Sequence, residues 1–289
     1  MPPEESLRRG ALLMVASAFF FAVMGIGVKA ASRDLPNTVV VFFRNAVGFA
    51  ALLPLLPRLG RGGLATAHVG EHLVRSLAGL AAMYCFFFAI GHMRLADAVL
   101  LNYSLPLFMP MIAWLWLKEP IPAGLWRGLV VGFLGVALIL KPGLALFNPV
   151  ALVGVAAAVL AALAQVGVRR LTETEPVTRI VFYFGLISTV VSAAPLIGTW
   201  RTPPRALWWI LLLMGICATV AQLLLTRAYA HAPAAQVGPF IYAAVPFAAL
   251  LDGFVFGQWP DALSIGGGAL VCAAGILILR DRLAAADVV

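Results

Sequence analysis

Apolar residues gather along the chain into long uninterrupted runs, separated by short links that carry proline, glycine and charge. A helix needs roughly 20 apolar residues to cross about 30 Å of hydrocarbon. Continuous runs of this length favour helices over barrel strands, in which apolar and polar residues alternate. The pattern predicts ten spans, at residues 10–31, 37–57, 73–92, 95–117, 124–141, 149–170, 177–200, 206–229, 233–257 and 262–280.

A constant offset of 140 residues relates the two halves of the chain. Without gaps it aligns Pro36 with Pro176, Pro106 with Pro246, and Pro120 with Pro260. Each half holds five spans, an odd number, so the second half must enter the membrane inverted. We therefore predict an all-α integral membrane protein with ten transmembrane helices in two inverted five-helix repeats, residues 1–140 and 141–289. Such repeats are typical of secondary transporters, because the two halves can exchange conformations.

Two spans related by this offset are predicted to be broken. Pro106 cannot donate a hydrogen bond to the carbonyl of Asn102, and Pro246 cannot donate one to Tyr242. Helical spacing places further residues on the same two faces, namely Tyr103, Pro110 and Trp114 in the first span and Pro239 in the second. We predict that these faces form opposite walls of a central cavity. The alternative is a packing kink, which is ordinary for proline in membrane helices.

Composition supports the membrane assignment and excludes several classes of protein. The chain is 63% hydrophobic and 11% charged, with a mean hydropathy of +1.01, so its apolar residues cannot all be hidden in a water-soluble core. The net charge of +8 forms no basic patch, so no nucleic acid is expected as a partner. The three cysteines lack metal or disulfide spacing. Paired intramembrane aspartates, an HExxH motif and a phosphate-binding loop are missing, so we expect neither an enzyme nor a bound metal or cofactor.

The distribution of positive charge predicts the orientation. With a cytoplasmic N-terminus, 13 of the 20 Lys and Arg residues fall on the inner side, so the positive-inside rule favours both termini in the cytoplasm. Two charges, Arg44 and Asp252, lie within spans at a comparable outward depth. We expect them to pair as an outer gate or to bind the charged ends of a solute. The alternative is that each side chain reaches separately to the interface. His68 and His72 fall in a cytoplasmic link, where solvated histidines are expected and no proton relay is assigned.

The remaining intramembrane polar and aromatic residues are candidates for the cavity lining. Uncharged donors and acceptors with aromatic walls favour an amphipathic solute, although each glutamine alone is equally explained by a hydrogen bond between helices. The predicted substrate-binding residues are Phe20, Arg44, Tyr84, Asn102, Tyr103, Pro106, Gln165, Tyr183, Gln222, Tyr242 and Pro246.

Glycines at helical spacing mark the fifth and tenth spans. The fifth carries Gly124, Gly128 and Gly132, and the tenth carries residues 266–268 and Gly275. Small residues let helices approach closely, so we expect both helices to be scaffold, touching each other or a second protomer. The protein is expected to be a monomer or a weak homodimer in the lipid bilayer.

The sequence resembles the EamA type of the drug/metabolite transporter superfamily over almost its whole length. The resemblance rests on the two five-helix halves, on Arg44, on the run from Pro106 to Glu119 and Pro120, and on a following segment with Trp126, Gly128, Gly132, Gly135 and Val136. It implies export of amino acids or metabolites across a bacterial-type cell inner membrane, with the fifth and tenth helices at the periphery.

The aromatic candidates favour the aromatic amino-acid exporters of this family, so the expected substrates are aromatic or neutral amino acids and related metabolites. The alternatives are a multidrug or cofactor/nucleoside-type carrier and, remotely, an intramembrane enzyme. Trp259 stands where the first half has Glu119, so the glutamate is interpreted as a helix-end feature.

Overall fold

The computed structural model describes residues 3–59, 63–92, 95–121, 124–141, 149–257 and 259–286. These residues form helices and contain no strand. The predicted boundary between the halves falls beside residues 142–148, which lie outside the described residues, as do 60–62, 122–123 and 258 in the predicted links. The helices are α1 (Pro3–Ala31), α2 (Asn37–Leu52), η1 (Leu53–Leu59), α3 (Val69–His92), α4 (Leu95–Asn102), α5 (Leu105–Leu117), α6 (Leu125–Leu140), α7 (Val150–Leu171), α8 (Val177–Ala193), η3 (Ala194–Leu196), η4 (Arg205–Leu207), α9 (Trp208–His231), α10 (Ala234–Val237), η5 (Gly238–Ala243), α11 (Ala244–Phe256) and α12 (Ala262–Ala286).

The helices make this an α-helical, multi-pass membrane protein. Parts of all ten predicted ranges are helical. Seven segments of the described chain are long and apolar enough to cross a membrane, and two more apolar helices, Leu125–Leu140 and Ala262–Ile278, are shorter. The apolar content of the chain thus folds into membrane-length helices whose backbone polar groups are satisfied within each helix.

Prolines fix where several helices begin and break. Pro36 and Pro176 have extended backbone (ψ 145° and 144°), and α2 and α8 start immediately after them. The two predicted broken spans are broken as expected. The first is divided into α4 and α5 at Tyr103 and Ser104, and the second has a six-residue 3-10 segment, η5, between α10 and α11.

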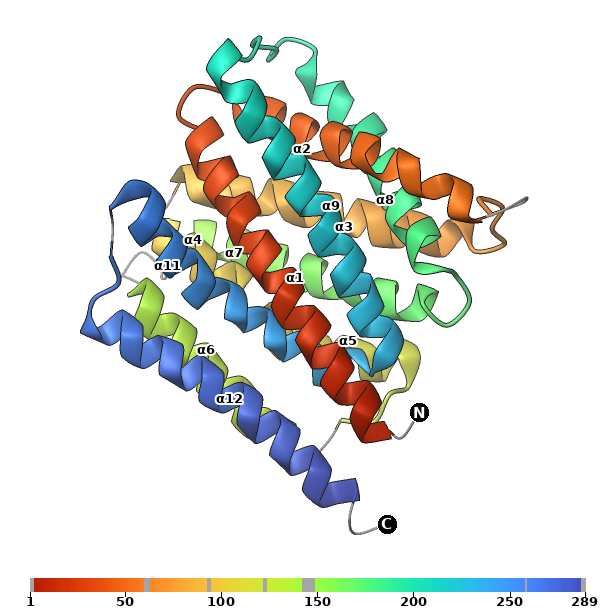
Figure 1. Cartoon of the computed structure of the whole chain (residues 1–289), viewed down its shortest axis with the longest axis vertical. Helices are drawn as coiled ribbons and strands as arrows, with labels where there is room; N and C mark the ends of the chain where they lie inside the picture. The colour runs from red at the N-terminus through yellow and green to blue at the C-terminus, as the bar shows by residue number, and fades with distance from the viewer. Residues whose placement is uncertain are drawn as a thin grey trace.

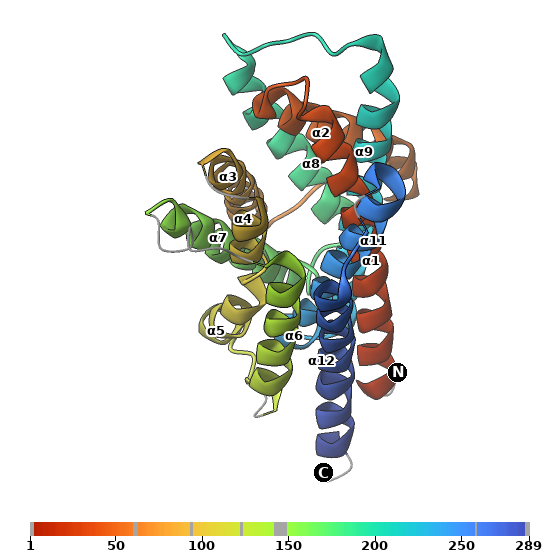
Figure 2. The same ribbon diagram turned by 90° about the vertical axis from the view of Figure 1, so that its left-hand side faces the viewer.

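The packing of the helices has the same pattern when the two halves are exchanged. The most extensive contacts join α1 to α9 and α3 to α7, and the 140-residue offset converts one of these pairs into the other. The pairs α2 with α8 and α6 with α12 are each their own equivalents. Figures 1 and 2 show α1 beside α9, α3 beside α7, and α6 with α12 along one edge of the molecule.

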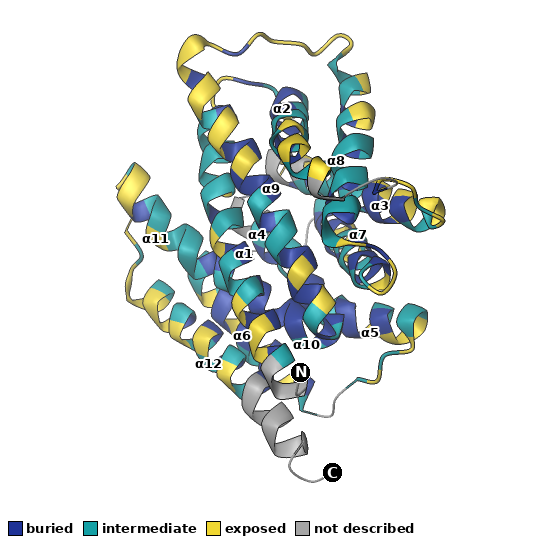
Figure 3. Ribbon diagram, turned by 45° about the vertical axis from the view of Figure 1, so that its right-hand side comes forward, coloured by how far each residue is buried: buried dark blue, intermediate teal, exposed yellow. Residues whose placement is uncertain are grey.

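Burial divides the molecule into an enclosed centre and an apolar exterior. In Figure 3 the short segment α10 lies within the buried interior, while exposed residues follow the outer sides of the long helices. Residues 238–242 of η5, which follow α10, are buried as well. Among the exposed side chains are large apolar ones such as Leu12, Leu152 and Phe254, each more than 70% exposed. In a membrane protein these side chains face lipid.

Helices α6 and α12 approach each other closely through glycine, so the expected contact between these two scaffold helices is confirmed. A Cβ added to Gly135 would lie 2.6 Å from the carbonyl oxygen of Gly267, and one added to Gly128 would lie 2.3 Å from the side chain of Ile278. The first contact is with backbone and the second with a buried side chain, so neither site has room for a Cβ at the present distance between the helices.

Replacing Gly267 by alanine is expected to destabilise the protein by about 1–3 kcal/mol, because the new methyl group would lie 2.5 Å from the Gly135 carbonyl oxygen. Thermal unfolding in detergent measures the effect. Gly266→Ala is the matched control, because a Cβ there meets nothing within 4 Å. Equal stability of the two variants would contradict the close packing of α6 and α12.

Candidate functional site

A small cavity with both polar and apolar lining residues lies between α2, α8 and α9. Its volume is about 20 Å³, room for about one water molecule. The lining combines guanidinium, amide and hydroxyl groups with two phenyl rings. It consists of Arg44, Asn45, Gly48, Phe49, Leu52, Val181, Phe184, Gly185, Ala218, Thr219 and Gln222. Two predicted site residues, Arg44 and Gln222, are therefore brought together.

Arg44 is held inside the protein by neutral partners. Arg44 is only 8% exposed, and its Nη1 donates a hydrogen bond to Oδ1 of Asn45 over 2.7 Å. The guanidinium carbon lies 5.6 Å from the centre of the Phe184 ring. Arg44 and Phe184 are separated by 140 residues, so equivalent positions of the two halves face each other across this cavity.

A second buried arginine, Arg75 of α3, was missed from the sequence. Arg75 is one of the 13 positive residues that the positive-inside rule places on the inner side, but it is 4% exposed and packs inside the molecule. Its Nη2 donates to Oε1 of Gln222 over 2.9 Å, and its guanidinium carbon lies 3.7 Å from the centre of the Phe184 ring. The glycine one turn later, Gly79, is the sequence signal that could have indicated a packed Arg75. A Cβ at Gly79 would lie 2.8 Å from Nη1 of Arg75, so the arginine side chain occupies the space that the glycine leaves.

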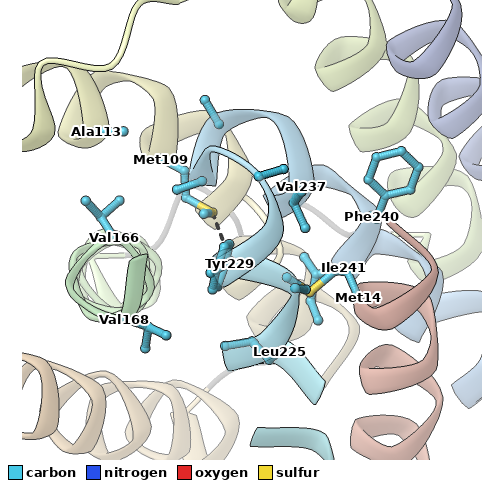
Figure 4. Close-up of a cluster of buried hydrophobic side chains, with 14 of the residues drawn as sticks. Met14, Met109, Ala113, Val166, Val168, Leu225, Tyr229, Val237, Phe240 and Ile241 are labelled. Atoms are coloured by element: carbon cyan, nitrogen blue, oxygen red, sulfur yellow. Dashed lines mark hydrogen bonds between the residues drawn. The ribbon is translucent and has the colours of Figure 1, made fainter. Parts of the chain in front are cut away.

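Tyr229 of α9 extends this polar interior toward α7, and it too was missed. It is fully buried, and its hydroxyl donates to Oε1 of Gln165, a predicted site residue. Figure 4 shows Tyr229 among apolar side chains, with its hydroxyl 3.9 Å from the sulfur of Met109. Gln165 thus makes an interhelical hydrogen bond and does not line the cavity between α2, α8 and α9.

The residues of the two broken spans lie elsewhere. Tyr103 and Tyr242 share an apolar cluster with Val136 of α6 and Val271 of α12. They fit there because these helices offer glycine at the contact: a Cβ on Gly132 would lie 2.6 Å from the Tyr242 ring. Neither tyrosine lines the cavity between α2, α8 and α9, and a central cavity between the two broken spans stays a prediction.

Three further residues of the broken spans follow the same arrangement. Pro106 is buried in α5, and Pro246 lies against α12, where its Cβ is 3.7 Å from a Cβ built on Gly268. Asn102 is the last residue of α4 and is partly exposed. Trp114, expected on the face of Tyr103, is 55% exposed, whereas Met109, Pro110 and Ala113 of the same helix are buried.

The other aromatic candidates are also outside the cavity lining. Phe20 packs edge-on against Phe19. The hydroxyl of Tyr84 is buried and has no hydrogen-bond partner among the described residues. Tyr183 lies at the start of α8, where its hydroxyl donates to the carbonyl oxygen of Leu64 over 2.8 Å.

His72 is buried beside a carboxylate, which corrects the expectation that it is a solvated link residue. It is 1% exposed and stacks on Tyr183, with ring centres 4.4 Å apart. Its Nε2 lies 4.0 Å from Oε1 of Glu175, which also accepts hydrogen bonds from Thr66 and Arg179. Burial alone would raise the pKa of Glu175, but these hydrogen bonds hold it below its usual value.

We expect the protein to lose stability as the pH falls from 6.5 to 5. Desolvation lowers the pKa of His72 from 6.5 to about 4 against the raising effect of Glu175, and the positive charges facing it, from Arg179, Arg75 and His68, lower it further. The unfolded chain therefore binds this proton first, so the stability contribution is complete above pH 6.5 and declines below it. Thermal unfolding of His72→Gln should show a weaker pH dependence than the wild type. The partly exposed His68→Gln is the control, and an unchanged slope in His72→Gln would refute the assignment.

Two ion pairs join helices, one at the last turn of α1 and one beside its start. At its last turn, Nζ of Lys29 lies 2.8 and 2.7 Å from the two carboxylate oxygens of Asp252 in α11. The predicted pair of Arg44 with Asp252 is therefore not formed. Arg44 and Asp252 do not meet because α11, which carries Asp252, packs on α1, whereas α2, which carries Arg44, packs on α8 and α9.

At the other end, beside the start of α1, Arg169 of α7 forms the equivalent contact. Its Nε donates to Oε1 of Glu119 over 2.9 Å, and its Nη1 donates to the carbonyl oxygen of Tyr229 over 3.0 Å. Oε2 of Glu119 accepts from the backbone N–H of Ala234 over 3.2 Å. Glu119 is thus more than the helix-end feature interpreted from sequence. Lys29 and Arg169 are 140 residues apart, so the two ion pairs use equivalent cations.

A multi-pass helical protein with a buried arginine in a cavity between its helices, and with ion pairs that join helices at and beside the two ends of α1, has the arrangement of a membrane transporter. Comparison with known proteins agrees. The EamA-like transporter family matches residues 8–141 and again residues 148–280. The chain belongs to the EamA-like transporter family, and it is a transporter, not an enzyme.

Characterised relatives carry different small molecules. The chain is 37% identical over 281 residues to the pseudopaline exporter CntI of Pseudomonas aeruginosa, covering 96% of this chain and 98% of the exporter. It is 30% identical to a riboflavin transporter of Vibrio cholerae (91% and 90% covered) and 27% identical to an S-adenosylmethionine uptake transporter of Rickettsia bellii (84% of each). A crystal structure with 18% identity matches the fold with a TM-score of 0.84, covering 94% of this chain and 98% of the other.

Proposed function

We propose that the protein is a secondary transporter that exports amino acids and related metabolites across the cell inner membrane by alternating access. In this proposal ten spans form two inverted repeats and both termini are cytoplasmic. The exchange-symmetric packing of α1 with α9 and α3 with α7 supports the repeat. The similarity to an exporter at 37% identity supports the direction.

The observation that carries the proposal is the buried Arg44 in the cavity between α2 and α8. A guanidinium group recognises a carboxylate through two parallel hydrogen bonds, and in this cavity it is held by the neutral amide of Asn45. Gln222 and Thr219 add polar groups to the lining, and Phe49 adds an apolar surface. These groups suit the carboxylate, amine and side chain of an amino acid.

The size of the cavity supports a mechanism with conformational change. Ligand pockets usually measure several hundred Å³, whereas this cavity has about 20 Å³. In this proposal the Lys29–Asp252 and Arg169–Glu119 pairs, both formed in the structure, hold a closed state. Substrate entry then requires opening at one end, and release requires opening at the other.

The second candidate is a cofactor carrier, favoured by the phenyl rings of Phe49 and Phe184 in the lining, which could hold a planar heterocycle. Purified protein in liposomes decides between the two. We expect counterflow of labelled amino acids. Counterflow of riboflavin or S-adenosylmethionine with no movement of any amino acid would refute the proposal.

A further inference from the structure

The cavity region contains two positive charges instead of the one predicted from sequence. The guanidinium carbons of Arg44 and Arg75 lie 5.6 and 3.7 Å from the centre of the same Phe184 ring. Because both residues are more than nine-tenths buried, neither charge is screened by bulk water. We propose, on the basis of the proposed transport function, that the substrate is an anion with at least two carboxylates, one bound by each arginine.

Neither arginine is neutralised by the protein. Within the part of the chain that the structure describes, no carboxylate forms a salt bridge with Arg44 or Arg75, and their hydrogen-bond acceptors are the amides of Asn45 and Gln222. The two positive charges also repel each other. Two buried, uncompensated charges are costly, and such charges are retained where function needs them. An anionic substrate supplies the missing negative charge.

The geometry leaves donors available for that substrate. Nε of Arg75 is buried and has no hydrogen-bond partner among the described residues. Nη2 of Arg75 donates to Gln222, a residue of the cavity lining, so we place the second carboxylate at the point where Gln222 now accepts this hydrogen bond. Phe184 lies under both guanidinium groups and stabilises them through its ring face. The site is therefore a receptor for two carboxylates joined by a short linker, as in a dicarboxylic amino acid or a larger polycarboxylate built from one.

The first test is binding, measured by thermal stabilisation of the full-length purified protein. The probes are glutamine, glutamate and γ-carboxyglutamate at equal concentration, which share a backbone and carry increasing numbers of carboxylates. We expect stabilisation to rise in that order, and the preference for glutamate over glutamine to be roughly tenfold in half-saturating concentration.

The second test replaces Arg75 by glutamine. We expect Arg75→Gln to lose the preference for glutamate over glutamine, while the melting temperature without ligand stays equal or rises, because a buried unpaired charge is removed. A purely structural Arg75 would give a lower melting temperature and an unchanged preference. Arg201→Gln, which removes an exposed arginine from a loop, is the matched control and should keep the preference.

The two hypotheses fail in different ways. If glutamate and glutamine stabilise the wild type equally, or if neither stabilises it, the dicarboxylate inference is overturned. This holds even if neutral amino acids show counterflow. An Arg75→Gln variant that keeps the wild-type preference overturns it as well. Counterflow of riboflavin or S-adenosylmethionine without any amino acid or carboxylate would instead refute the proposed function.

Discussion

Replacing Arg44 by alanine is expected to reduce counterflow of the transported substrate roughly 10- to 100-fold, the effect of losing a hydrogen-bonded contact with a charged partner worth about 1.5–3 kcal/mol. The folded protein should persist, because Arg44 has no carboxylate partner among the described residues and its removal leaves only the amide of Asn45 to rearrange. Initial rates in liposomes measure the loss, and the monodisperse yield in size-exclusion chromatography measures folding.

The control for this experiment is Arg201→Ala, which removes an exposed arginine far in sequence from the cavity lining. It should transport at the wild-type rate. An Arg44→Ala protein with the wild-type rate would show that Arg44 does not bind substrate. A loss of yield matching the loss of rate would assign Arg44 a structural role instead.

Breaking either ion pair at the ends of α1 is expected to open the cavity at that end. Asp252→Asn leaves Lys29 without its carboxylate partner, and Glu119→Gln weakens the contact of Arg169. A closed state held by a contact worth a few kcal/mol loses most of its population when that contact is removed. The two variants should therefore expose the same cavity from opposite sides of the membrane.

Thiol labelling distinguishes the two sides. In a background with Cys85, Cys217 and Cys272 replaced by serine, Ala218→Cys places one thiol in the cavity lining. A membrane-impermeant maleimide should label it at least tenfold faster from the Lys29 side in Asp252→Asn, and from the other side in Glu119→Gln.

A third ion pair serves as the control for labelling. Lys141 pairs with Asp261 at a more exposed site, so Asp261→Asn should leave the labelling rate unchanged. Restoration of slow labelling by the charge exchange Lys29→Asp with Asp252→Lys would support the pairing directly. Equal labelling from both sides in both variants would refute a role of these pairs in closing the cavity.

The fold was largely predictable because its signals are local. A run of apolar residues specifies a helix wherever it lies, and Pro36 and Pro176 specify where α2 and α8 begin. Glycine spacing also predicted that α6 and α12 could touch, since only a residue without a side chain permits the contact of Gly135 with Gly267.

The site was less predictable because it depends on which faces of the helices meet. Arg75 lies near the start of its helix, where the positive-inside rule explains any arginine, so only the packing of α3 reveals its burial. Tyr242 carries the aromatic and polar character of a substrate ligand but packs against Gly132. The sequence also suggested a mainly uncharged lining, whereas the structure places a second arginine beside Phe184, which is the basis of our proposal of an anionic substrate.

Each of the two ion pairs joins a residue of the first half to a residue of the second, and this affects how the rate and the direction of transport are set. Lys29 and Glu119 belong to residues 1–140, and Asp252 and Arg169 to residues 141–289. In our proposal these two contacts are barriers that a solute crosses whichever way it travels, so by microscopic reversibility they set how fast the protein cycles, and the electrochemical gradients of the transported solutes set the direction of net flux. One fold can then serve both an exporter and an uptake transporter, as the names of two relatives in this family record. In our proposal, outward flux follows from a metabolite that is made inside the cell.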